Sequence, residues 1–310
     1  MIVLWVALTV VGLAAAVRAS SRGVDHAAKA ALGLNLPPFA VGFTLVAVGT
    51  DLPEIANSVT ASIAGFGDVN AGDSIGSAAA QASLVIGLAP FLARRGTIVN
   101  RREVLVLAGL AVAVLLLGAG LMADGDLGRG DGVALVLSWA LAVTAAWRWT
   151  SPPAQPELPL REQRAWVHAA KAIGWLVLVL VAATAAVYGL TETATALAFP
   201  QYLVSFFGLA IGTSLPELVV VVAALRDGHG ELALGDALGA TLADASLSIG
   251  IGPIVAPTLV TAGLAVRAGL VTAALVGLVG LVLAAVGRHN RFTGVAAIAL
   301  YVGAIPLLVG

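Results

Sequence analysis

The sequence contains no cysteine and few charged residues. Of its 310 residues, 11% are charged and 5% are aromatic, whereas 60% are hydrophobic and the mean hydropathy is +1.02. The absence of cysteine excludes disulfides and thiolate metal sites. The shortage of charge excludes an ordinary soluble domain, in which roughly 25% of residues are charged. The composition therefore predicts an all-α integral membrane protein.

Apolar runs along the chain are long enough to cross a bilayer, which takes about 20 helical residues. The first run has no positive region before its apolar core, as a signal peptide would have, so we count it as a span. We predict ten transmembrane helices near 2–20, 35–63, 71–92, 103–122, 131–149, 166–188, 200–225, 232–262, 267–287 and 293–309.

Lys and Arg are distributed unevenly between the two sides of these spans. If the N-terminus faces outward, 14 of the 16 basic residues fall in inward loops, and only Arg129 and Arg267 fall outside. Positive residues are enriched in cytoplasmic loops. The pattern therefore predicts a multi-pass protein of the cell membrane with both its N-terminus and its C-terminus outside.

An internal repeat divides the chain into two halves. Shifting the sequence by 163 residues aligns 43–90 with 206–253 without a gap and gives 21 identities in 48 positions. The predicted units are a first five-span repeat at 1–149, a Pro-rich cytoplasmic linker at 150–165 and a second repeat at 166–310. Because five is odd, the second repeat enters the membrane from the opposite side, as in transporters built around a midplane site.

The stretch GTDLPE at 49–54 has a second copy, GTSLPE, at 212–217. Proline cannot continue the hydrogen bonding of a helix, so each copy predicts a bend that frees backbone carbonyls. A twofold relation between the halves would bring Glu54 and Glu217 together near the midplane. Ca²⁺ takes ~6–8 hard oxygens, so two glutamates and freed carbonyls around 47–50 and 210–213 could bind it. No histidine or cysteine is nearby to favour a softer metal.

A second motif follows in each half, GDSIGSAAAQAS at 72–83 and GDALGATLADAS at 235–246. Its small residues, such as Gly76 and Gly239, permit close helix contact. Gln81 and Asp244 lie deepest in their spans and are candidate site residues. Asp73 and Asp236 are expected near helix starts, where they would act as caps. The histidines at 26, 168 and 289 are expected to be exposed at span ends.

The paired motifs in a ten-span chain resemble those of the calcium/cation antiporters, in particular the prokaryotic sodium/calcium exchangers. The resemblance implies alternating access, with Ca²⁺ exported against Na⁺ and no tightly bound cofactor. It implies that Glu54 and Glu217 bind calcium with help from Thr50 and Thr213. The carbonyls of Ala47 and Ala210 would bind sodium, and the first and sixth spans would slide across the core. Flanking positions would be completed by Ser77, Ser214, Gln81 and Asp244.

Several positions depart from the family pattern. Asp51 and Ala240 stand where serine is usual, and Gln81 stands where Asn or Asp is usual. Repulsion between Asp51 and Glu54 favours proton uptake by one of them. Coupling to H⁺ is therefore the alternative to coupling to Na⁺, and a divalent cation other than Ca²⁺ stays open.

Two other classes of protein share part of this pattern. Intramembrane aspartyl proteases carry a G-x-G-D motif, but the first glycine is missing from both NAGD at 70–73 and ALGD at 233–236. The same oxygens could line a channel filter, although an inverted repeat favours alternating access. The sequence thus predicts a transporter rather than an enzyme. Inorganic cations and the lipid bilayer are the partners that it implies, with no nucleic acid and no protein partner.

Overall fold

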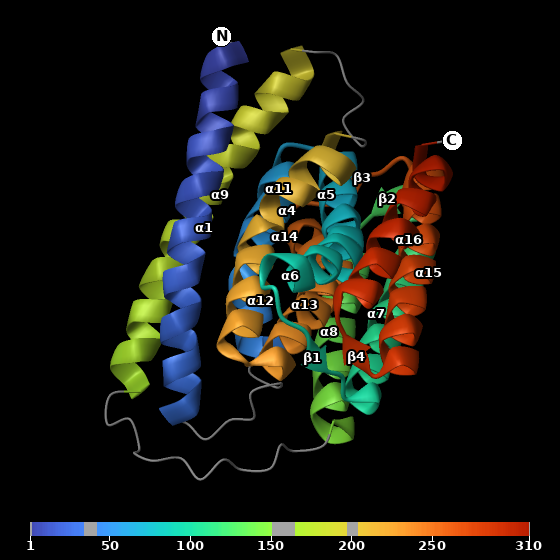
Figure 1. Ribbon diagram of the computed structural model, residues 1–310. Helices are drawn as coiled ribbons and strands as arrows, with labels where there is room; N and C mark the ends of the chain where they lie inside the picture. Colours follow the sequence, from blue (N-terminus) through green and yellow to red (C-terminus); the bar gives the residue numbers. More distant parts are fainter. Residues whose placement is uncertain (1, 34–41, 151–164, 197–203, 310) are drawn as a thin grey trace.

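The computed structural model describes residues 2–33, 42–150, 165–196 and 204–309 (Figure 1). These residues are almost entirely helical. In chain order, the helices of the first half are α1 (Ile2–Gly33), η1 (Gly42–Val46), α3 (Ala47–Thr50), α4 (Leu52–Ile63), α5 (Gly67–Ala80), η2 (Gln81–Val85), α6 (Ile86–Leu92), α7 (Arg101–Leu121) and α8 (Arg129–Trp149). The helices of the second half are α9 (Ala165–Ala196), η3 (Val204–Leu209), α11 (Ala210–Thr213), α12 (Leu215–Asp227), α13 (Gly230–Ala243), η4 (Asp244–Ser248), α14 (Ile249–Val255), α15 (Ala262–Val286) and α16 (Arg291–Val309).

Six helical stretches among the described residues are long and apolar enough to cross a membrane. They are 67–92, 101–121, 129–149, 230–255, 262–286 and 291–308. A seventh is present if the bent pair 205–213 and 215–227 counts as one span. The predicted spans at 2–20 and 166–188 lie within α1 and α9. The predicted linker at 150–165 lies almost wholly outside the described residues.

The two GT-LPE motifs break their helices as proline requires. Pro53 and Pro216 occupy the first turns of α4 and α12, where a missing N–H costs nothing. The residues before these turns, Asp51 and Ser214, have ψ of 1° and 4° and so interrupt the helical path. In the second half the segments on either side of the break meet at 43°. Each glutamate therefore lies in the first turn of a new helix inside the protein.

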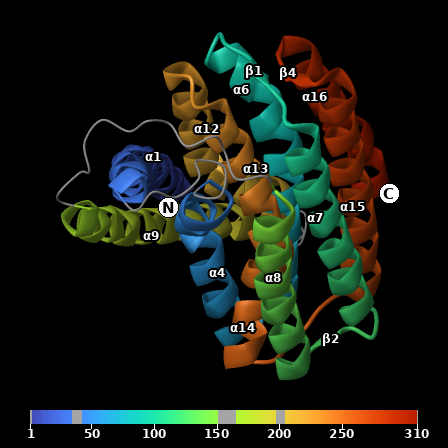
Figure 2. The ribbon, with the colours of Figure 1, turned by 90° about the horizontal axis from the view of Figure 1, so that it is seen from below.

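The most buried helices lie in the middle of the molecule (Figure 2). Within 67–92 and within 230–255, 78% of the apolar window is buried, compared with 22% in α8. Gly76 and Gly239 make the close contacts that the sequence predicted. A Cβ at Gly76 would lie 2.4 Å from the carbonyl oxygen of Phe206, and one at Gly239 would lie 2.4 Å from Cα of Phe43. The 163-residue offset relates Gly76 to Gly239 and Phe43 to Phe206, so each contact is the counterpart of the other.

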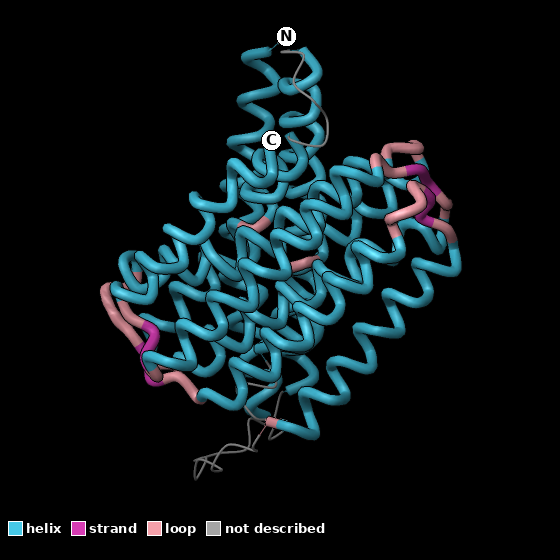
Figure 3. The backbone as a smooth tube through the Cα atoms, turned by 90° about the vertical axis from the view of Figure 1, so that its right-hand side faces the viewer, coloured by secondary structure: helices cyan, strands magenta, loops and turns pink. Residues whose placement is uncertain are grey.

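Two short antiparallel sheets join the halves at opposite ends of the molecule (Figure 3). In one, β1 (Thr97–Ile98) pairs with β4 (Arg288–His289), with Thr97 opposite His289. In the other, β2 (Asp126–Leu127) pairs with β3 (Thr258–Leu259). Each sheet takes one strand from each half, and the repeat relates one sheet to the other.

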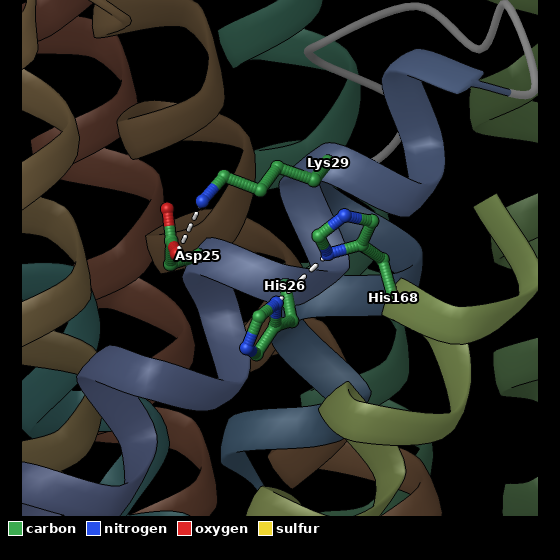
Figure 4. A network of polar contacts seen from close by, with 4 residues as sticks. All are labelled: Asp25, His26, Lys29 and His168. Atoms are coloured by element: carbon green, nitrogen blue, oxygen red, sulfur yellow. Dashed lines mark hydrogen bonds and ion pairs between the residues drawn. The ribbon is translucent and has the colours of Figure 1, made fainter. Parts of the chain in front are cut away.

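Helices α1 and α9 pack side by side, to one side of the other helices (Figures 1 and 2). Toward one end of the pair, the rings of Trp5 and Tyr188 meet edge to face at 5.4 Å. Toward the other end, Nδ1 of His26 lies 2.9 Å from Nδ1 of His168, beside an ion pair between Asp25 and Lys29 (Figure 4). The expectation of plainly exposed histidines is wrong for His289, which is 1% exposed where β4 pairs with β1.

Candidate functional site

Three carboxylates from both halves of the chain converge in the interior. Asp51 immediately precedes α4, and Glu54 and Glu217 lie in the first turns of α4 and α12. One oxygen from each carboxylate lies within 4.8 Å of the other two. All three side chains are fully buried. This convergence makes the acidic cluster, by which we mean Asp51, Glu54 and Glu217, the strongest candidate for a cation site among the described residues.

The backbone around the cluster favours negative charge. The first turn of a helix carries unpaired N–H groups and the positive end of the helix dipole. Glu54 and Glu217 lie at such ends. The helix breaks therefore place both carboxylates where the backbone offsets part of the cost of burying them.

Ser77, on α5, connects the two halves at the cluster. Its hydroxyl lies 3.4 Å from Oε1 of Glu54 and 3.3 Å from Oγ1 of Thr213. It also lies 3.4 Å from the carbonyl oxygen of Ala210. The corresponding residue in the second half is Ala240, which has no hydroxyl. The surroundings of the two glutamates are therefore unequal.

The structure brings Asp73 into the site, where the sequence predicted a helix cap. Asp73 is fully buried and accepts a 2.6 Å hydrogen bond from Nδ2 of Asn57, while its other oxygen lies 3.5 Å from Oγ1 of Thr213. Asp236 is also fully buried, and both of its carboxylate oxygens lack a hydrogen-bond partner. The capping prediction is wrong because α5 and α13 begin at Gly67 and Gly230, well before these residues. The i, i+4 spacing of Asp73, Ser77 and Gln81 was the signal that could have found Asp73.

The other predicted residues are all buried but differ in their contacts. Thr50 bonds back to its own helix, with its hydroxyl 3.0 Å from the carbonyl oxygen of Ala47. That oxygen also accepts a hydrogen bond from the N–H of Asp51, and the carbonyl of Ala210 accepts one from Ser214. Both carbonyls therefore keep their usual partners four residues on.

Gln81 and Asp244 occupy corresponding positions in η2 and η4. The Gln81 amide donates to Oδ1 of Asp51 at 3.4 Å. Neither carboxylate oxygen of Asp244 has a hydrogen-bond partner, and the hydroxyl of Ser214 has none either. Asp244 lies outside the group of three that converge within 4.8 Å.

Among the described residues, no basic side chain forms an ion pair with these buried acids. The one ion pair found there, Asp25 with Lys29, is on α1. An isolated buried carboxylate is too costly to keep charged without a partner, so the cluster requires cations or protons. Its donors are all hard oxygens, the ligands that Ca²⁺ and Na⁺ prefer and soft transition metals do not.

A broken helix from each half, with buried acids at the breaks, defines a multi-pass membrane transporter of cations. Comparison with known families agrees. Residues 4–148 and 169–309 match the family described as sodium/calcium exchanger protein. The chain belongs to this family of membrane antiporters.

Known proteins align with most of the chain. It is 31% identical over 265 residues to the inner membrane protein YrbG of Escherichia coli, covering 81% of this chain and 80% of that protein. It is also 31% identical over 260 residues to the putative antiporter CaxA of Alkalimonas amylolytica, covering 80% and 79%. Among solved structures, it is similar to the sodium-calcium exchanger NCX_Mj soaked with Na⁺ and Sr²⁺. The TM-score is 0.74 at 27% identity, covering 99% of both chains.

Proposed function

We propose that this chain is a secondary active antiporter that exchanges Ca²⁺ for Na⁺ by alternating access at a midplane carboxylate site. The observation that carries the proposal is the convergence of Asp51, Glu54 and Glu217, fully buried and within 4.8 Å of one another. Two glutamates balance the charge of one divalent ion. The likeness to a solved sodium-calcium exchanger supports both transported ions.

We assign the remaining ligands by their contacts with the cluster and by whether their oxygens already have hydrogen-bond partners. Ser77 and Thr213 contact it or its neighbours directly and would complete the coordination of the divalent ion. Asp244, Ser214 and Gln81 have buried oxygens without hydrogen-bond partners and would bind Na⁺ beside it. Thr50 donates its hydroxyl proton to its own helix, so its oxygen keeps its lone pairs for a cation. The carbonyl oxygens of Ala47 and Ala210 each accept at least two hydrogen bonds, so they would bind Na⁺ only when one of these bonds is released.

We propose that ten transmembrane helices form two inverted five-helix repeats, 1–149 and 166–310, joined by a cytoplasmic linker at 150–165. Two observations support this arrangement. The contact of Gly76 with Phe206 in one half corresponds to the contact of Gly239 with Phe43 in the other. The sheet at one end likewise corresponds to the sheet at the other end. Helix α1 begins and α16 ends at the same end of the molecule (Figure 1). This supports both termini lying on one side of the membrane, which from the distribution of Lys and Arg we propose is the outside.

Coupling to H⁺ is the second candidate. Asp51 adds a carboxylate to the cluster, and Ala240 removes a hydroxyl from the second half. A carboxylate that is buried beside another acid tends to hold a proton. An exchanger built on these residues could release that proton when Ca²⁺ binds.

The test is ⁴⁵Ca²⁺ uptake into proteoliposomes under an imposed Na⁺ gradient or an imposed pH gradient. Wild type, Glu54→Gln and Asp51→Ser are compared. We expect Na⁺-driven uptake that is abolished in Glu54→Gln and retained in Asp51→Ser. A Glu103→Gln variant, which changes a buried acid at the start of α7, serves as the control and should transport normally.

The other outcomes separate the alternatives. Uptake driven only by the pH gradient, with Asp51→Ser losing that dependence, would make H⁺ the coupling ion. Uptake that depends on neither gradient, or single-channel currents in planar bilayers, would exclude antiport.

A further inference from the structure

A cleft of about 240 Å³ lies between α4, along most of its length, and the C-terminal part of α9. Its lining is mostly apolar, including Phe66, Val69 and Tyr188, and its polar side chains include Asn57 and Thr60 from α4 and Glu192 from α9. Glu192 is the only charged side chain among the described residues that line it, and it is partly exposed. The cleft therefore has one acidic residue at an otherwise uncharged wall.

The inner wall of the cleft reaches the candidate site. Asn57 lines the cleft and also donates a 2.6 Å hydrogen bond to Asp73. Asp73 lies 3.5 Å from the hydroxyl of Thr213, which lies 3.3 Å from Ser77, and Ser77 lies 3.4 Å from Glu54. An unbroken series of polar side chains thus runs from the cleft to the acidic cluster.

The corresponding place at the opposite end of the α1–α9 pair has different chemistry. The 163-residue offset relates Glu192 to Lys29 and Tyr188 to Asp25. Lys29 and Asp25 form a 2.8 Å ion pair with each other (Figure 4). The same offset relates Asn57 to Val220, which is apolar. At this end the offset replaces Glu192 by a lysine and Asn57 by a valine, so the cleft is not simply a product of the repeat.

We propose that Glu192 recruits the transported cation at the cleft, and that Asn57 passes the cation to Asp73 and the acidic cluster. A negative charge beside low-dielectric walls concentrates cations locally. The amide oxygen of Asn57 can bind a cation while its NH₂ group bonds to Asp73. The identity of the cation rests on the proposed function, whereas the charge selectivity of the cleft does not.

The first test measures that selectivity without transport. The chain has no cysteine, so Thr60→Cys places a single thiol in the cleft. In neutral detergent, its reaction rate is measured with a cationic and with an anionic methanethiosulfonate reagent. Adding Glu192→Gln should lower the ratio of the cationic to the anionic rate roughly threefold or more. Adding Asp126→Asn, which changes an exposed acid of β2 outside the cleft, should leave the ratio unchanged.

A ratio that is the same with and without Glu192→Gln would overturn the proposal. So would a thiol that reacts with neither reagent, as expected if lipid acyl chains fill the cleft. Because this measurement needs no transport, either result stands whether or not the protein exchanges Ca²⁺.

The second test measures recruitment during transport. The initial rate of ⁴⁵Ca²⁺ uptake is followed against external Ca²⁺ for wild type, Glu192→Gln and Asp126→Asn. At low ionic strength, Glu192→Gln should raise the half-saturating Ca²⁺ concentration roughly threefold and leave the maximal rate unchanged. High salt should abolish the difference, since it screens exposed charges. A lower maximal rate with unchanged half-saturation would instead indicate a structural role and would reject recruitment by Glu192.

Discussion

Besides the matched pair Glu54 and Glu217, each half of the chain has one carboxylate near the site whose position has no acidic counterpart in the other half. The first half has Asp51 on the helix break and the amide of Gln81 on η2. The second half has the hydroxyl of Ser214 at the break and Asp244 on η4. Gln81 donates to Asp51, so the acid and the amide of the first half are adjacent. The first half therefore has its additional carboxylate at the helix break, and the second half has its additional carboxylate on η4.

This exchange can be tested with a double variant. Asp51→Ser should raise the half-saturating Ca²⁺ concentration roughly tenfold, because it removes a buried negative charge beside the ion. Adding Gln81→Asp should recover most of the loss by returning the carboxylate to the position that Asp244 occupies in the second half. The measurement is ⁴⁵Ca²⁺ uptake by wild type, both single variants and the double variant. If the double variant is as weak as Asp51→Ser, the two positions are not equivalent.

At the residue scale, the sequence singles out candidate acids but does not predict how deeply each one is buried. The twofold repeat singled out Glu54 and Glu217 because matched carboxylates in apolar spans are seldom accidental. The sequence predicts a capping role for Asp73, whereas in the structure its carboxylate is fully buried, accepts a hydrogen bond from Asn57 and lies close to the hydroxyl of Thr213. Whether an acid near a helix start is exposed depends on which other helices cover it. That information is absent from local sequence.

At the scale of the helices, close packing at small residues positions the site. Gly76 and Gly239 let α5 and α13 approach η3 and η1, the segments that lead into the two breaks. The sequence predicts close helix contact at these glycines and the proline breaks. It does not predict the π-helical segments η1, η2, η3 and η4. Such segments lack a strong local signature and are often found at functional sites.

A Gly239→Ala variant tests the packing. Its Cβ would lie 2.4 Å from the backbone of Phe43, which cannot move aside as a flexible side chain would. Overpacking of this kind costs about 1–3 kcal/mol, so we expect a lower Tm in detergent and weaker ⁴⁵Ca²⁺ uptake.

The matched control is Gly109→Ala on α7, where an added Cβ meets nothing within 4 Å. Alanine favours a helix over glycine by ~1 kcal/mol, so the Tm of this variant should stay the same or rise. Equal Tm values for the two variants would contradict the packing argument.

At the scale of the whole molecule, the two short sheets link the halves at both ends. His289 lies in β4, opposite Thr97 of the first half, and is 1% exposed. Burial lowers the pKa of His289 to about 4. The folded protein therefore keeps this imidazole neutral, and proton uptake at this position favours unfolding.

The pH dependence of stability follows from that shift. The unfolded chain binds a proton at His289 near its ordinary pKa of 6.5, and the folded chain does so only near 4. Stability is thus complete above pH 6.5 and falls between pH 6.5 and 4, by roughly 3 kcal/mol in total. Wild type should lose more Tm between pH 7 and pH 5 than His289→Gln does. The exposed His229 provides the control, since His229→Gln should behave as wild type.

The sequence by itself determined the membrane location, the internal repeat, the proline breaks and the pair of matched glutamates. These features follow from composition and from residues close together in the chain. Only the tertiary structure decided which acids share one site, that Ser77 bridges the halves, and that a cleft leads from Glu192 to Asn57 and Asp73. The physical reason is that these contacts join residues as much as 166 positions apart. The geometry of these contacts depends on how whole helices pack against one another. The pattern of neighbouring residues in the sequence does not specify that packing.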